Sequence, residues 1–152
     1  MVIEINNFNS LKKPLSKLSA ESPPLFGIMT AQHMLEHLLA TILISYGKLQ
    51  TKLFNPADKA AKAKQLLIYS EIDFPKGMKA PMIGDELPAL RFPSIEIVKD
   101  KLAFEIAQFE SYYRENARAT QLHPVLGELN YEEWIIFHNK HFTHHFIQFN
   151  LL

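Results

Sequence analysis

The chain has 152 residues, and its 16 basic and 16 acidic side chains give a formal net charge of zero. Hydrophobic residues make up 47% and charged residues 21%, a balance that is typical of a folded globular domain and excludes wholesale disorder. The zero net charge argues against a nucleic-acid-binding protein. The lack of cysteine excludes disulfides, thiolate zinc sites and thiol nucleophiles.

The first two predicted helices differ in length and burial. Ser10–Ser19 predicts a short amphipathic helix, because the leucines at positions 11, 15 and 18 fall on one side, and Pro23 and Pro24 end this segment. Thr30 is a good N-cap for the run AQHMLEHLLATILISYGKL, which predicts a longer and largely buried helix.

Two more helices are predicted in the middle of the chain, with a long connection between them. One begins at Asn55 and Pro56, where Asn caps and Pro takes the first helical position. The other begins near Ser94 and runs to about Arg118. The connection over 71–93 is rich in Pro and Gly, and its length suggests a loop that wraps over a pocket.

The last predicted helix has the clearest start, because Asn130 can cap it and Glu133 follows three residues later, as in a capping box. It is predicted to continue to the C-terminus. Apart from a few residues near Met82 or Phe92, no segment alternates over strand length. The sequence therefore predicts one all-α domain over residues 1–152, a four-helix bundle with a short leading helix and a long loop between the second and third main helices.

The cellular location is predicted from the lack of a membrane-spanning segment and of a secretory signal in the sequence. No stretch approaches the roughly 18–20 unbroken apolar residues of a membrane span. Met1–Ser10 contains Glu4 and several Asn, which does not resemble a secretory signal. We expect a soluble, cytoplasmic protein without a nucleic-acid or membrane partner.

The seven histidines are the side chains that favour a transition metal, and four of them lie in the last helix. His144 is displaced to the flank of that helix and is expected to be partly exposed. The others share one inward face with two aromatic residues at helical spacing: Trp134, His138, His141, His145 and Phe149.

His141 and His145 are four residues apart, so their imidazoles can converge on one ion. A third ligand has to come from another helix, where His37 and His33 are available one turn apart. Three imidazoles would leave an open position for water or substrate. The alternative is that these histidines only pack in the core. His138 is expected either to contact a ligand from behind or to pack in the core, and His123, beside Pro124, is expected to be a surface or turn residue.

Two segments resemble the DinB/YfiT-like metalloprotein superfamily. MTAQHMLEHLL (Met29–Leu39) is similar to its first-helix motif, and HFTHHFIQF (His141–Phe149) is similar to its last-helix pattern, a His-x-x-x-His pair followed by Gln. The lead-in HPVLGELNYEEW (His123–Trp134) resembles a short uncharacterised branch, whereas the middle of the chain matches weakly. The resemblance implies a four-helix bundle with a metal bound by His37, His141 and His145, and frequent dimers.

Some members of that superfamily are thiol transferases that use bacillithiol, mycothiol or glutathione. The resemblance therefore implies a divalent metal and a low-molecular-weight thiol as cosubstrate that attacks a small electrophile. Three nitrogen ligands suit Zn, Ni, Cu or Fe, and of these we expect Zn or Ni. A metal-dependent hydrolase and a non-catalytic bundle that binds metal or a small ligand, or forms a homodimer, are the alternatives. Glu36, Glu133 and His138 are candidate general bases, and no catalytic residue is assigned.

Overall fold

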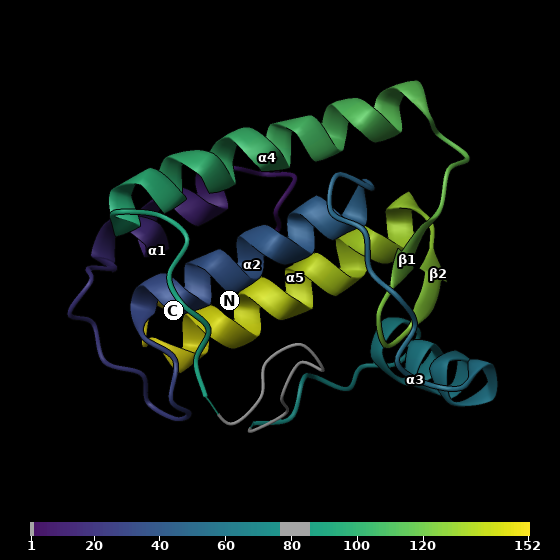
Figure 1. Ribbon diagram of the computed structural model, residues 1–152, viewed down its shortest axis with the longest axis horizontal. Helices are drawn as coiled ribbons and strands as arrows, with labels where there is room; N and C mark the ends of the chain where they lie inside the picture. The colour runs from purple at the N-terminus through teal and green to yellow at the C-terminus, as the bar shows by residue number, and fades with distance from the viewer. Residues whose placement is uncertain (1, 77–85) are drawn as a thin grey trace.

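The computed structural model of the chain describes residues 2–76 and 86–152. This part of the chain is mainly helical, as predicted, with one small two-stranded sheet (Figure 1). The elements in chain order are α1 (Asn9–Lys17), α2 (Ala31–Ser45), α3 (Ala57–Ile68), α4 (Ile95–Glu115), β1 (Gln121–His123), β2 (Gly127–Leu129) and α5 (Tyr131–Gln148). None of the described helices is both long and apolar enough to cross a lipid bilayer.

Helices α2, α4 and α5 form the centre of the molecule. α2 packs against both α4 and α5, and in Figure 1 α2 and α5 run side by side while α4 lies along them. The hairpin and α3 sit together at one end, next to the beginning of α5. The core between these elements is aromatic and aliphatic, and its largest fully buried side chains include Trp134, Phe109, Phe142, Phe146, Met34 and Leu35.

Three of the predicted helix starts are confirmed by side-chain caps. Thr30 accepts a hydrogen bond from the N–H of His33, and Ser94 accepts one from the N–H of Ile97. Asn130 and Glu133 bond each other's backbone N–H groups in a complete capping box. Each cap satisfies backbone donors that the first helical turn leaves unpaired, so the cap residue determines where the helix begins.

Three predicted helix boundaries are wrong. Asn55 does not cap α3, because its side-chain amide donates to the carbonyl of Val125, and Pro56 occupies the cap position instead. α4 stops at Glu115, short of Arg118, with Asn116 as its C-cap. α5 ends at Gln148 rather than at the C-terminus, and Asn150 beyond it has a left-handed backbone with φ 56°.

The sequence did not predict the hairpin. It predicted that His123 is a surface or turn residue, and the surface position is wrong. β1 and β2 pair antiparallel with His123 opposite Gly127, and three residues per strand are too few to show an alternating pattern. His123 is buried and lies at the end of β1, next to the turn. Its Nδ1 accepts hydrogen bonds from the N–H groups of Val125 and Leu126 at 3.0 and 3.1 Å, which closes the turn from within.

Neither possible strand position in the predicted 71–93 loop is supported: Met82 lies outside the described residues, and Phe92 lies outside any strand. The described parts of this loop are anchored at both ends. Lys140 on α5 donates to the carbonyls of Leu67, Ser70 and Ile72 at 2.7–2.9 Å. At the other end, Glu36 on α2 accepts from the N–H of Arg91 at 2.8 Å. These contacts attach the connection to the two helices that carry the histidines.

Candidate metal centre

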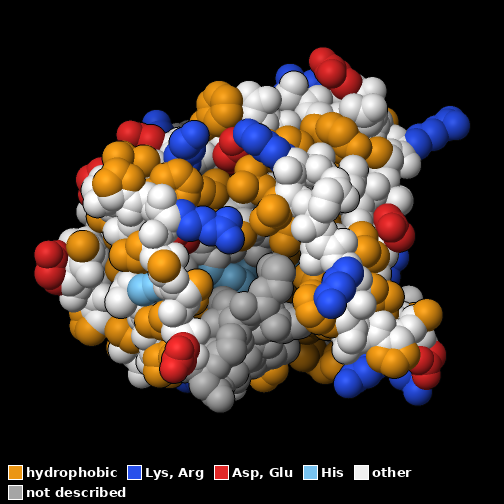
Figure 2. Space-filling view, in the orientation of Figure 1, with side chains coloured by type: hydrophobic (Ala, Val, Ile, Leu, Met, Phe, Trp, Pro, Cys, Tyr) orange, Lys and Arg blue, Asp and Glu red, His pale blue; other side chains and the backbone are white. Residues whose placement is uncertain are grey.

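The structure brings His37, His141 and His145 together between α2 and α5. One ring nitrogen from each lies within 4.8 Å of the others, and the Nε2 atoms of His37 and His141 are 2.9 Å apart. His141 and His145 are buried, and His37 is partly buried. Histidine side chains are visible at the surface on the face that Figure 2 shows. Residue spacing predicted a shared site for His141 and His145, and the DinB/YfiT-like resemblance implied His37 as the third member.

The three imidazoles are uncharged at neutral pH. Burial, with a contribution from His144, lowers the pKa of His37 to about 4, and burial lowers the pKa of His145 to about 3. Burial and the neighbouring His37 hold the pKa of His141 well below its ordinary value. A neutral imidazole keeps a lone pair on one ring nitrogen, which is the form that binds a metal ion.

Gln148 determines which nitrogen of His145 carries the proton. Its side-chain N–H donates to the carbonyl of Phe26 at 2.9 Å, so its oxygen is the atom that faces His145 Nδ1 at 2.7 Å. An amide oxygen only accepts, so His145 Nδ1 must be protonated and the lone pair lies on Nε2. Gly27 has φ +80°, and a Cβ there would come within 2.9 Å of the Gln148 amide nitrogen, so a larger residue would disturb this arrangement.

The nitrogen separations are close to those of a metal site but do not match them. Two nitrogens at 2.0–2.1 Å from a tetrahedral ion lie about 3.3 Å apart. The observed separations, from 2.9 Å up to 4.8 Å, lie on both sides of that value. Within residues 2–76 and 86–152, no further His, Asp or Glu joins the group, so the three nitrogens would leave a coordination position open.

Aromatic rings surround the cluster. The rings of Phe74 and Phe137 lie with centroids 5.6 and 5.1 Å from that of His141. The ring of His144 lies 5.0 Å from that of His145 and is flanked by Phe26 and Phe74. His144 is half-buried at the edge of the cluster, as its flank position on the helix predicts. Phe26 and Phe74 come from connecting segments without periodicity, so the sequence carried no signal for them.

The other candidate residues serve different purposes. His33 contacts Thr30 Oγ1 through Nδ1 and donates from Nε2 to the carbonyl of Pro88, so neither nitrogen is free for a metal. The carboxylate of Glu36 accepts from loop backbone N–H groups. Glu133 completes the cap of α5 and pairs with Tyr69 and Lys64. His138 is completely buried and lies outside the group.

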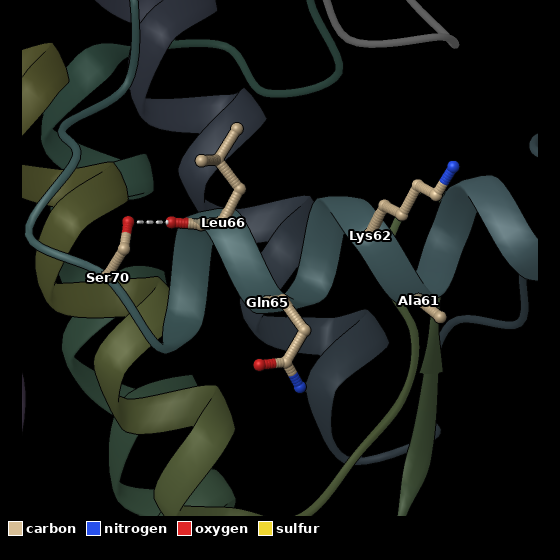
Figure 3. Close-up of a pocket in the computed structure, with 5 residues that line it drawn as sticks. All are labelled: Ala61, Lys62, Gln65, Leu66 and Ser70. Atoms are coloured by element: carbon tan, nitrogen blue, oxygen red, sulfur yellow. Dashed lines mark hydrogen bonds between the residues drawn. The ribbon is translucent and has the colours of Figure 1, made fainter.

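A shallow apolar depression on α3 is separate from this cluster. It is open to solvent and is lined by Ala61, Lys62, Gln65, Leu66 and Ser70 (Figure 3). Ser70 Oγ donates to the carbonyl of Leu66 within it. None of its lining residues is a carboxylate or a histidine, so it offers no ligand set comparable to the histidine cluster.

Comparison with known proteins gives no match: no family model, no curated protein and no solved structure corresponds to this chain. The DinB/YfiT-like resemblance of the two histidine motifs stays a prediction. The three neutral rings and the hydrogen bond that orients His145 define the chemistry open to the cluster.

Two buried histidines outside the cluster predict acid sensitivity of the metal-free protein. Burial lowers the pKa of both His123 and His138 to about 3. Between pH 6.5 and 3 these histidines take up protons in the unfolded chain but stay neutral in the folded chain. The free energy of unfolding is therefore highest above pH 6.5 and decreases as the pH falls below that value. At pH 5 we expect a loss of about 2 kcal/mol for each residue relative to pH 7.5. Urea unfolding in the presence of a chelator measures this, and a flat profile over the same range would contradict it.

Proposed function

We propose that the chain is a DinB/YfiT-like metalloprotein in which His37, His141 and His145 hold one divalent transition metal. In this proposal α2, α3, α4 and α5 are the helices of a four-helix bundle. The observation that carries the proposal is the convergence of three neutral imidazoles from two helices, with nitrogens within 4.8 Å of one another. An all-nitrogen donor set suits Zn or Ni, and the fourth position would remain open to a small ligand.

The proposed activity is transfer of a low-molecular-weight thiol to a small electrophile. A bound divalent metal lowers the pKa of a thiol or water that joins it, which gives a nucleophile at neutral pH. Because the chain has no cysteine, the thiol has to be a cosubstrate. Phe74 and Phe137, packed against His141, make the surroundings apolar and would limit access of water.

The positions of the carboxylates favour thiol transfer over hydrolysis. Activating a water in an apolar site benefits from a general base within hydrogen-bond reach of the water. Glu36 and Glu133 are engaged with the loop backbone and with the start of α5, respectively. A thiol is acidic enough that its metal-bound form needs no such base. The non-catalytic alternative, a bundle that binds metal or a small ligand or forms a homodimer, makes no demand on a base either.

The experiment that separates these functions compares Zn-loaded, Ni-loaded and metal-free protein. Each form is mixed with glutathione, bacillithiol or mycothiol and an electrophilic aromatic dye. We expect thiol-dependent consumption of the dye by a metal-loaded form only. Ester hydrolysis without any thiol would identify a hydrolase instead, and no turnover by any metal form would favour the non-catalytic alternative.

Gln148 gives a prediction for metal affinity. Gln148→Leu keeps the approximate size of the side chain and removes the acceptor for His145 Nδ1. We expect zinc affinity to fall about 10–100-fold, because the partners of ligating histidines fix ring orientation and basicity. Gln148→Glu keeps an acceptor at this position and serves as the matched control. Isothermal titration with zinc measures both, and equal loss in the two variants would show that the hydrogen bond is not the cause.

A further inference from the structure

Lys140 on α5 binds the backbone at the end of α3. Its Nζ donates to the carbonyls of Leu67, Ser70 and Ile72 at 2.7, 2.9 and 2.8 Å. An ammonium group has three donors, so this backbone can satisfy all of them. The last carbonyls of a helix have no partner inside it, and a positive charge is favourable there. Lys140 therefore ties the end of α3 to the helix that carries two of the clustered histidines.

Capping of α3 alone does not explain this contact. α3 ends at Ile68, so two of the three carbonyls belong to the segment that follows the helix. Lys140 also directly precedes His141, a proposed metal ligand. In the described part of the chain, other lysines that donate to a carbonyl outside their own helix each reach a single one: Lys17, Lys64 and Lys99. The contact with three carbonyls is thus made beside the histidine cluster.

Phe74 is the buried side chain of the segment that Lys140 holds. It is 8% exposed, whereas the other residues over 71–76 are exposed, so the segment runs along the surface and Phe74 points inward from it. The ring of Phe74 lies 5.6 Å from that of His141 and 5.9 Å from that of His144. Phe74 therefore lies between a surface segment and the histidine cluster.

We propose that Lys140 is a positioning residue that keeps Phe74 against His141 and thereby limits access to the open coordination position. This role rests on the proposed function, because it concerns the position that a thiol or water would occupy. Ile72, the last residue whose carbonyl Lys140 binds, is only two residues from Phe74, so the contact restricts how far the ring can move. Without the ammonium, these carbonyls turn to water and the segment opens locally more often.

Chemical modification of the metal-free protein tests this placement. Diethyl pyrocarbonate modifies accessible neutral imidazoles, and mass spectrometry identifies the histidine that has reacted. Lys140→Met removes the ammonium and keeps an unbranched side chain, whereas Phe74→Ala removes the ring. We expect each to raise the modification rate of His141 at least about 10-fold, the first by loss of charge-assisted hydrogen bonds and the second by loss of cover. The rate for His138, which is 0% exposed on the same helix, should stay unchanged.

A double variant shows whether Lys140 acts through Phe74. Lys140→Met combined with Phe74→Ala should modify His141 no faster than Phe74→Ala alone, because the ring that the lysine positions is already absent. Lys99→Met is the matched control. Lys99 lies on α4, which carries none of the clustered histidines, and its side chain is 16% exposed and donates to the carbonyl of Leu18. It should leave the rate for His141 unchanged.

Zinc-loaded protein gives the second measurement. A chelator should remove zinc faster from Lys140→Met by the same factor, with little change in affinity, because all three ligands remain. An unchanged rate for His141 in either single variant, or additive effects in the double variant, would show that the inference is wrong while the proposed function stands. Equal acceleration at His138 would make the role of Lys140 merely structural. If wild-type protein binds no zinc but the modification rates change as expected, the proposed function is wrong and the placement of Phe74 by Lys140 stands.

Discussion

Replacement of His141 by Ala is expected to remove the metal from the protein, with affinity falling by at least about 100-fold. His141 is the central ligand of the group, because its Nε2 faces His37 and its ring lies 4.8 Å from that of His145. Without it, two imidazoles from different helices remain, and two nitrogens hold a divalent ion far more weakly than three. The same loss is expected for His145→Ala.

The metal content of purified His141→Ala protein measures this effect, with circular dichroism to show that the variant is folded. His33→Ala is the matched control, because His33 lies one turn before His37 and both of its ring nitrogens contact Thr30 or Pro88. It should keep the wild-type metal content. Metal that survives His141→Ala would show that the ligand assignment is wrong.

Replacement of Phe109 by Ala is expected to lower the free energy of unfolding by about 3–5 kcal/mol. Phe109 lies on α4 and is 0% exposed. Its ring contacts Tyr113 on its own helix and Tyr131 and His138 on α5, so it joins the two helices at the centre of the core. The substitution removes the whole ring and leaves a cavity between them.

Phe104 provides the control on the same helix, because its side chain is 54% exposed. Phe104→Ala should change the free energy of unfolding by no more than about 0.5 kcal/mol. Urea unfolding of both variants in the presence of a chelator keeps metal binding out of the comparison. Equal effects at the two positions would contradict the packing described for α4.

The helices could be predicted because their starts are encoded locally. Thr30, Ser94 and Asn130 each accept a hydrogen bond from a backbone N–H three residues later, and this pattern is visible in sequence. Asn55 was misassigned as a cap because its amide bonds Val125, which lies 70 residues away along the chain. A contact between segments so distant in sequence leaves no local signal.

The part of the histidine cluster that depends on local spacing could be predicted, and the part that depends on distant contacts could not. The spacing of His141 and His145 places both on one face of α5, and this follows from the sequence alone. The choice of His37 over His33 could not be made from residue spacing, because it depends on Thr30 and the carbonyl of Pro88, which occupy the ring of His33. The Phe26 carbonyl that orients Gln148 was equally invisible, since any residue presents a carbonyl.

The loop signal at Pro124 predicted a surface or turn residue at His123, and the surface position is wrong because such a signal says nothing about burial. In the structure the ring of His123 lies under the hairpin turn, against Trp134 and Phe137, and it supplies the acceptor that a buried turn needs. A turn residue with an inward-facing acceptor and one with an outward-facing side chain have the same sequence pattern.

Elemental analysis of wild-type protein purified without a metal-affinity tag decides whether His37, His141 and His145 hold a metal. We expect about one equivalent of a divalent transition metal per chain, and zinc or nickel should restore it to stripped protein and raise the thermal midpoint. Absence of bound metal, together with an unchanged midpoint after addition of zinc or nickel, would contradict the claim that His37, His141 and His145 form a metal site.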